Sequence, residues 1–217
     1  MDVLHPQLRS HRETGRSWPA LVWQTGEALR MIASAPHGGG LGPRRWVVNA
    51  QVPSSYGRRH PDDHLEALAA AYGLPGRGVG MLTAAEVRSV RTRSDGGVDV
   101  AVTVGLGTPT WAAAPDIPGT VAATGTINVM AFVPERLADA ALVNAVGTVT
   151  EAKAQALWEM GVPATGTATD AVCIACPDGR GGAAFAGPRS TWGARLARAV
   201  HAAVMDGAAA TTTGGAR

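Results

Sequence analysis

Aromatic residues are scarce in this chain of 217 residues, and long apolar segments are missing. Aromatic residues make up 5% of the sequence and hydrophobic residues 46%, so Ala, Val and Leu must fill most of a folded interior. No apolar run approaches the roughly 18 residues that span a membrane, and no charged and then apolar leader is visible. We therefore expect one compact globular domain in the cytoplasm, without a membrane partner.

An excess of charge of either sign is also missing. The chain has 19 basic and 17 acidic residues and a formal net charge of +2, which gives no electrostatic reason to expect nucleic-acid binding. Arg44-Arg45 and Arg58-Arg59 are short basic pairs, and we interpret both as solvated surface. The expected partner is a small molecule, and the sequence says nothing about oligomeric state.

Cysteine is nearly absent. Cys173 and Cys176 form a lone C-x-x-C, and a tetrahedral metal site needs further ligands that no second cysteine pair supplies. If residues 169–175 form a strand, positions three apart point to opposite faces, so the two thiols diverge. We expect neither zinc nor redox chemistry at this motif.

The periodicity predicts a single α/β domain over residues 18–206, with residues 1–17 and 207–217 as flexible termini. A hairpin around Asp95-Gly96-Gly97 coexists with strand-helix-strand order, so we expect a mixed or antiparallel sheet with packed helices. Strands are predicted at 20–25 and 27–33, joined by a turn at Gly26, and at 46–49, 87–93, 98–104, 126–133 and 171–175; helices are predicted at 62–72, 137–160 and 191–206.

Polar side chains concentrate between Gly125 and Asp170 at the ends of apolar elements, where a fold can hold and expose them. Lys153 falls in the apolar row of the predicted helix 137–160 and either extends to the surface or meets a carboxylate or substrate. A neighbouring row of Asn144, Thr148, Glu151 and Gln155 is polar, which from periodicity alone favours a solvated helix face.

Glycines punctuate the segment from Ser34 to Pro43. Gly38, Gly39 and Gly40 form either a flexible connector or a loop whose backbone approaches a ligand closely. No Lys-Ser or Lys-Thr follows to complete a phosphate-binding loop. Further along the chain, Trp111 lies in the irregular segment 105–119, where it either covers a flat ligand or caps the core.

Six short segments of the chain together resemble the adenosylcobinamide amidohydrolase family. Each is short, but their order along residues 28–177 is specific. The matching segments are Gly38–Gly42, Val48–Val52, Gly80–Ala85, Gly125–Asn128, Thr150–Lys153 and Thr165–Asp170.

The resemblance implies hydrolysis of the amide that joins the corrin propionyl side chain to aminopropanol, releasing adenosylcobyric acid for cobalamin (vitamin B12) salvage. Cobalt then belongs to the corrinoid substrate, and no protein cofactor is expected. The alternative is a corrinoid-binding or carrier protein without catalysis. The expected catalytic residues are Thr126, Glu151 and Lys153, and the expected substrate-binding residues are Gly38, Gly39, Gly40, Asn49, Asn128, Thr167 and Asp170.

Within this hypothesis Glu151 acts as general base and Lys153 stabilises developing negative charge. The Gly-Thr step at 125–126, followed by an apolar strand and a helix, also resembles a pattern of self-processing aminopeptidases and ornithine acetyltransferases. In those enzymes the hydroxyl residue after the glycine cuts its own chain and becomes the nucleophile, so the resemblance implies this role for Thr126. Asn128, two residues later, is a candidate oxyanion donor. In the other interpretation Thr126 only begins a strand, where β-branched residues are favoured, and water attacks the amide.

Overall fold

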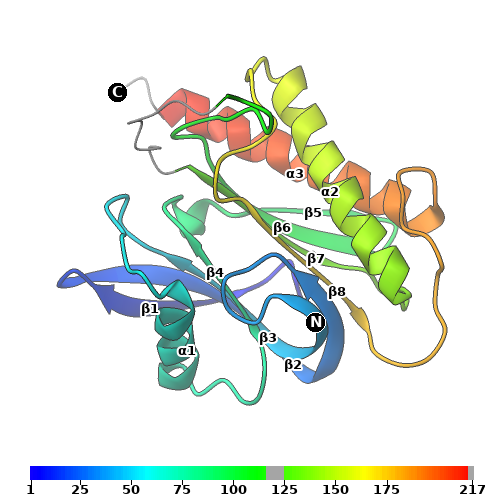
Figure 1. The fold of residues 1–217 in the computed structure, drawn as a ribbon, viewed down its shortest axis with the longest axis horizontal. Helices are drawn as coiled ribbons and strands as arrows, with labels where there is room; N and C mark the ends of the chain where they lie inside the picture. The colour runs from blue at the N-terminus through cyan, green and yellow to red at the C-terminus, as the bar shows by residue number, and fades with distance from the viewer. Residues whose placement is uncertain (116–124, 215–217) are drawn as a thin grey trace.

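A computed structural model describes residues 1–115 and 125–214, with side chains to residue 210, and contains one sheet with three α-helices (Figure 1). The eight strands form a mixed sheet in the order β4-β3-β2-β8-β7-β6-β5, and β1 pairs with β2. This confirms the predicted α/β fold with a mixed sheet. The elements are β1 (Gln7–Glu13), β2 (Arg16–Ala33), β3 (Gly40–Gln51), α1 (Pro61–Ala71), β4 (Val79–Thr83), η1 (Val87–Ser89), β5 (Arg91–Asp95), β6 (Val98–Gly105), β7 (Thr126–Phe132), α2 (Asp139–Glu159), β8 (Ala171–Pro177) and α3 (Thr191–Gly214).

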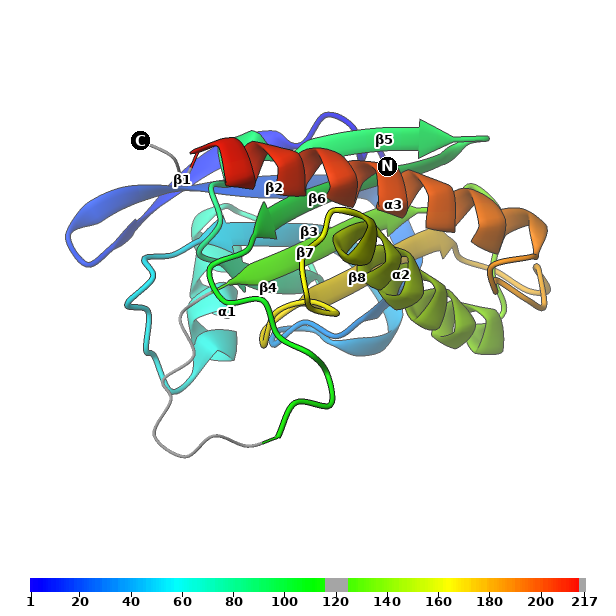
Figure 2. The ribbon, with the colours of Figure 1, turned by 90° about the horizontal axis from the view of Figure 1, so that it is seen from above.

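The helices divide the core into layers. Residues of α2 and α3 pack with one face of β6, β7 and β8, while α1 packs on β2 and β3 (Figures 1 and 2). A third apolar cluster lies on the inner face of the sheet and includes Met31, Val47, Met81 and Met130. The side chain of Asn128 in β7 donates to the Leu82 carbonyl in β4 at 2.9 Å, although three strands separate β7 from β4 in the sheet. The sheet therefore curls until its two halves meet.

Strand alternation decides which β7 side chains enter the curled interior. Ile127 and Val129 belong to the core beneath α2 and α3, whereas Met130 belongs to the inner cluster. Because side chains two residues apart share a face, Thr126 and Asn128 point to the same side as Met130. Both are buried, so β7 carries a polar end inside the fold.

Several predicted elements are confirmed. The hairpin of β5 and β6 turns at Gly96 and Gly97, whose φ angles of 53° and 91° lie in the region that glycine adopts without strain. The α2 face predicted from its spacing buries Leu142, Val149 and Ala156. The polar row beside it is not uniformly solvated, because Thr148 is buried and donates to the Ala186 carbonyl at 2.8 Å.

The predicted hairpin at Gly26 is wrong, because β2 continues through it. Gln24 pairs with Trp46 and Leu29 with Arg44, so four residues of β2 stand opposite one residue of β3. This irregularity accommodates Gly26 without reversing the chain. Its carbonyl accepts from the Arg45 guanidinium at 3.0 Å.

The expectation that no ordered element precedes Trp18 is also wrong. Residues 7–13 form β1, which pairs with β2 in antiparallel register from Gln7 opposite Val22 to Glu13 opposite Arg16. A polar sequence forms a strand here because its backbone groups pair with a longer neighbour. At the other end, α3 continues through the alanine-rich residues 207–210 to Gly214, in keeping with the high helix propensity of alanine.

The two cysteines lie on opposite faces of β8, as predicted. Cys173 packs in the inner cluster and Cys176 packs beneath α2 and α3, and both are free thiols. Burial raises the pKa of Cys173 to about 12, so it is a protonated, inert thiol at neutral pH. Within residues 1–115 and 125–214, no group of three or more His, Cys, Asp or Glu side chains is arranged to hold a metal ion. None of the helices described is long and apolar enough to cross a membrane.

Candidate functional site

The centre of the candidate site is an ion pair between Lys153 of α2 and Asp170, which immediately precedes β8. The side chains of both residues are 10% exposed, so the pair lies at the edge of the core. Of the two roles expected for Lys153 in its apolar row, extension to the surface or contact with a carboxylate or substrate, the structure shows contact with a carboxylate. An ammonium has three donors and Asp170 takes one of them, so Lys153 is able to donate to a ligand oxygen as well.

Asp170 also organises the backbone around the pair. Its Oδ1 accepts from the amide of Ile127 at 2.8 Å, and its Oδ2 accepts from the amide of Thr167 at 3.0 Å. A side chain at Gly166 would collide with both the carboxylate and the Lys153 ammonium, so glycine leaves the space that the pair fills. Asp170 therefore connects the start of β7, the 165–170 turn and α2.

Three threonine hydroxyls gather at the start of β7. The carbonyl oxygen of Gly125 accepts from Thr167 at 2.7 Å and from Thr169 at 3.0 Å. Thr126 Oγ1 lies 2.7 Å from Thr169 Oγ1. Thr169 Oγ1 thus lies within hydrogen-bond distance of both the Gly125 carbonyl and the Thr126 hydroxyl. This arrangement holds the Thr126 hydroxyl, in a residue that is 4% exposed, in one orientation.

A groove of about 490 Å³ opens beside this cluster. One wall is the α2 turn that carries Glu151 and Lys153, and the other is formed by the loops at 110–112 and 165–168. The lining residues are Thr110, Trp111, Ala112, Thr150, Glu151, Lys153, Ala154, Thr165, Gly166, Thr167 and Ala168. The structure thus brings together the predicted residues Glu151, Lys153, Thr167 and Asp170, with Thr126 linked to them through Thr169 and Gly125.

Glu151 occupies the exposed rim of this groove. It is two residues from Lys153 on α2, a spacing that turns the two side chains to different sides of the helix. Glu151 also lines a smaller groove of about 250 Å³ between α2 and α3, together with Arg198 and His201. A ligand in the larger groove is therefore able to contact both side chains, but the ion pair at Lys153 does not include Glu151.

Asn49 and Asn128 meet inside the curled sheet. Asn128 Nδ2 donates to Asn49 Oδ1 and to the Leu82 carbonyl, both at 2.9 Å, and Asn49 Nδ2 donates to Thr103 Oγ1 at 3.0 Å. Both hydrogens of the Asn128 amide are thereby used within the protein. Asn128 consequently has no amide hydrogen left for an oxyanion, which corrects the predicted donor role; its remaining polar atom is an acceptor.

The glycine loop folds back against β4, where the backbone of His37 pairs with that of Gly80 and a Cβ at Gly38 would collide with the Gly78 carbonyl. Gly80 is also the register partner of Val48 in β3, which places His37 about two strand spacings, or about 10 Å, from the residue before Asn49. The Arg44 guanidinium fastens the loop by donating to the Gly38 carbonyl at 2.9 Å, and a side chain at Gly39 would approach the Ala35 carbonyl oxygen to 2.5 Å.

A buried polar cluster between β1, α1 and the segment 52–60 was not predicted. Glu13 accepts from Arg58 at 2.7 Å, and His64 Nδ1 lies 2.9 Å from the Tyr56 hydroxyl. His11 Nε2 donates to the Gln51 carbonyl at 2.9 Å, and burial lowers the pKa of both histidines. The only local sequence signal is the alternation of His11 and Glu13 on one strand face, because their partners Gln51 and Arg58 lie 40 and 45 positions away.

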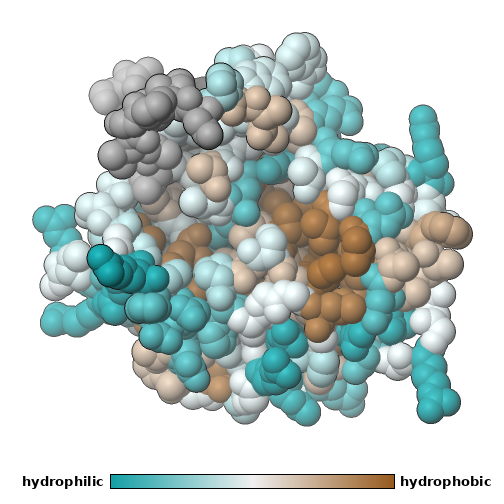
Figure 3. Space-filling model, viewed as in Figure 1, coloured by the Kyte–Doolittle hydropathy of each residue, from teal (hydrophilic) through white to brown (hydrophobic). Residues whose placement is uncertain are grey.

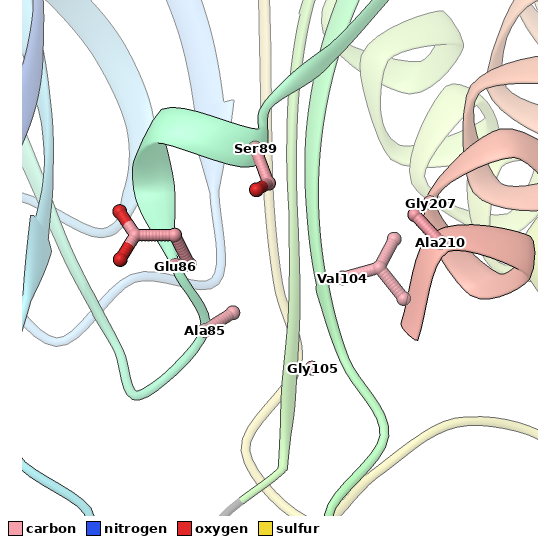
Figure 4. Close-up of a pocket in the computed structure, with 7 residues that line it drawn as sticks. All are labelled: Ala85, Glu86, Ser89, Val104, Gly105, Gly207 and Ala210. Carbon is pink, nitrogen blue, oxygen red and sulfur yellow. The ribbon is translucent and has the colours of Figure 1, made fainter. Parts of the chain in front are cut away.

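A further cavity of about 320 Å³ lies between η1, the end of β6 and the last part of α3 (Figure 4). Glu86 is the only charged residue among those that line it, and its carboxylate already accepts from the Arg88 amide at 3.1 Å. In the view of Figure 3 the surface mixes polar and apolar side chains, with the largest apolar area just right of the centre and a smaller one to the left. The groove at Lys153 combines more reactive groups than the cavity in Figure 4.

Comparison with known proteins agrees with the motifs. The sequence matches the adenosylcobinamide amidohydrolase family over residues 1–216. An adenosylcobinamide amidohydrolase from Methanosarcina mazei is 31% identical over 137 residues, which are 63% of this chain and 64% of that protein. One from Halobacterium salinarum is 39% identical over 132 residues, 57% of this chain and 55% of that protein. The aligned region thus spans less than two thirds of each curated relative. The family match covers nearly the whole sequence, and the chain therefore belongs to the adenosylcobinamide amidohydrolase family.

Proposed function

We propose that this protein hydrolyses the amide between the corrin propionyl side chain and the aminopropanol of adenosylcobinamide, in the salvage of cobalamin. The products are adenosylcobyric acid and aminopropanol. The observation that carries the proposal is the convergence of the Lys153–Asp170 pair and the Thr126 hydroxyl beside an open groove. The name of the two related proteins supports the choice of substrate.

The reaction adds water across the amide, so a C–O bond forms, the C–N bond breaks and the amine leaves with a proton. Glu151 is the proposed general base, because it is an exposed carboxylate on the groove rim. Lys153 is the proposed stabiliser of the tetrahedral oxyanion through its remaining N–H donors. Asp170 then holds the ammonium at the edge of the groove, so its contribution to substrate binding passes through Lys153.

Thr126 is the proposed nucleophile. In this version its hydroxyl oxygen attacks the amide carbon, the amine leaves, and water then hydrolyses the acyl-threonine ester. The hydrogen bond between Thr126 and Thr169 supports the role by fixing the hydroxyl, and the burial of Thr126 counts against it, because a bulky corrinoid needs access. If water attacks directly, Thr126 is part of the scaffold.

The proposed substrate-binding residues differ in how directly they face the groove. Thr167 lines the groove itself, whereas Asn49 and Asn128 lie in the interior. The Gly38–Gly40 loop stays a proposed binding segment, and Gly40 is the position that tests it, because a Cβ there meets no atom within 4 Å. Gly40→Asn tolerates the φ of 80° and should weaken corrinoid binding if this loop contacts the substrate.

We propose the cytoplasm as the compartment, which the two free cysteines support. Cobalt enters as part of the substrate, and we propose no resident metal or organic cofactor. The alternative function is a corrinoid carrier without catalysis. Incubation of purified protein with adenosylcobinamide separates the two: release of aminopropanol together with the carboxylate product supports hydrolysis, and tight binding without release supports the carrier.

A further inference from the structure

Two exposed tryptophans meet at one end of the groove. Trp111 is 43% exposed and Trp158 is 68% exposed, and their ring centroids are 6.3 Å apart with planes inclined at 57°. The remaining tryptophans of the described residues, Trp18, Trp23, Trp46 and Trp192, are buried or half-buried. An indole buries a large apolar area when it packs, so leaving two beside each other in water forgoes that stabilisation. A pair of this kind marks a contact surface.

Ordered backbone holds Trp111 at the groove. The amide of Thr110 donates to the Gly166 carbonyl at 2.8 Å, and the amide of Thr165 donates back to the Thr110 carbonyl at 3.1 Å. The amide of Ala112 donates to the Thr165 hydroxyl at 2.9 Å. The residues on both sides of Trp111 are thus fastened to the opposite loop, and Trp111 itself lines the groove.

Trp158 continues the wall formed by α2. It follows Glu151 by seven residues, which is two helical turns, so the two side chains share one side of the helix about 10 Å apart. The groove therefore runs from a reactive part, with Glu151 and Lys153, to Trp111, and Trp158 lies against Trp111 just beyond the lining residues. The distance of about 10 Å between Glu151 and Trp158 is comparable with the distance from the centre of a macrocycle to the end of one of its side chains.

We infer that Trp111 and Trp158 form a subsite for the adenine of the adenosyl ligand; the inference rests on the proposed function. A corrin has saturated carbons with methyl groups and side chains on its rim, so an indole cannot lie flat on it. Adenine has two flat, unobstructed faces, and stacking on aromatic side chains tolerates any base. Because the two indole planes are inclined, adenine is able to stack on the face of one indole and contact the edge of the other. The exposed carboxylate of Glu151 also suits the net positive charge of an alkyl-cobalt(III) corrin.

The test compares two substrates that differ only in the upper ligand, adenosylcobinamide and methylcobinamide, in dim red light. For Trp111→Ala and Trp158→Ala, KM for the adenosyl substrate should rise about 5- to 150-fold, the equivalent of about 1–3 kcal/mol per stacked base. KM for methylcobinamide should change less than about 2-fold, within about 0.4 kcal/mol. Trp158→Phe should keep most of the affinity, because it retains an aromatic face.

Phe185→Ala is the matched control, since Phe185 is 73% exposed and lies outside the groove. An equal loss with both substrates would overturn the adenine assignment, because it would place the corrin against the indoles or show a general change in the groove. Unchanged KM values would overturn the subsite altogether.

Failure of the proposed function gives a different result. In that case the wild-type protein releases no aminopropanol from either substrate. Equilibrium dialysis with adenosylcobinamide and methylcobinamide then tests the subsite without turnover. A preference for the adenosyl form that both alanine variants lose supports it, and its absence in the wild type contradicts it.

Discussion

Asn128 donates one amide hydrogen to Asn49 at 2.9 Å and the other to the Leu82 carbonyl at 2.9 Å, which joins β7 to both β3 and β4 inside the curled sheet. The Leu82 carbonyl only accepts, so it fixes which end of the Asn128 amide is nitrogen. Asn128 Oδ1 is buried, and no partner for it lies among the described residues. The pair therefore closes the polar end of the interior and presents an acceptor there.

Asn128→Asp should destabilise the fold. It replaces the amide nitrogen and its two N–H donors by one oxygen, which faces the acceptors Asn49 Oδ1 and Leu82 O. A buried group left without its partner costs about 1–3 kcal/mol, and more when it is charged. Urea unfolding should show a loss of at least about 2 kcal/mol. The control is Asn144→Asp on α2, an exposed side chain whose Oδ1 accepts from Ala186, because aspartate keeps that acceptor. Equal stability of both variants would show that the Asn128 hydrogen bonds are not important for folding.

Glu151→Gln should lower turnover by about 100-fold or more, the range in which a general base contributes. Glu151 is exposed, so the substitution should leave the free energy of unfolding nearly unchanged. Initial rates of aminopropanol release measure the effect, with Glu135→Gln as an exposed control away from the groove. Wild-type turnover in the Glu151 variant would remove this residue from the chemistry.

Thr126→Ala and Thr126→Ser distinguish the two mechanisms. If Thr126 is the nucleophile, the serine variant should retain measurable turnover and the alanine variant should lose it, because only serine keeps a hydroxyl. Intact-mass measurement of the wild-type protein shows in addition whether the Gly125–Thr126 bond is cut, although an intact chain excludes only self-processing. Wild-type rates in a folded alanine variant would establish direct attack by water.

Breaking the Lys153–Asp170 pair should destabilise the fold much more than breaking a surface ion pair. Removing one member leaves an uncompensated charge at the edge of the core, and Lys153→Met or Asp170→Asn should each cost about 3–5 kcal/mol. The double variant should recover part of this loss, since it leaves no unpaired charge. The exposed pair of Arg198 and Asp95 is the reference, with an expected contribution of about 0–1 kcal/mol. Additive losses in the double variant would show that the two charges do not interact.

Acid should destabilise the protein through His11. Burial lowers the pKa of His11 below its ordinary value of 6.5, so on acidification the unfolded chain binds a proton before the folded chain does. The resulting loss of stability should begin as the pH falls through about 6.5 and level off below the folded-state pKa. His64, whose pKa is also lowered, contributes in the same direction.

His11→Gln should flatten this dependence, because glutamine keeps an N–H donor for the Gln51 carbonyl but does not titrate in this range. Thermal unfolding between pH 5 and pH 8 measures the difference. His5, an exposed histidine at the N-terminus, provides the control substitution. If the two variants have the same pH profile as the wild type, His11 is not responsible for the acid sensitivity.

The sequence by itself determined the local elements and the family. The hairpin at Gly96 and Gly97, the strand from Thr126 and the buried face of α2 each follow from spacing or turn chemistry within about 20 residues. The six ordered motifs identified the family, which comparison confirmed. The adjacency of Glu151 and Lys153 to the 165–168 turn was indicated only by those motifs, because nothing in local periodicity relates a helix to a later loop.

Only the tertiary structure decided which polar groups meet. The side chains of Asn49 and Asn128 are 79 positions apart and touch because the sheet curls, and the loop before β3 returns to pair His37 with Gly80 of β4. The β1 strand and the continuous β2 depend on pairing between neighbours and leave no strong pattern in the chain. Strand register and sheet curvature result from the sum of many distant contacts, so no short segment encodes the position of Lys153 beside Asp170 or of Trp111 beside Trp158.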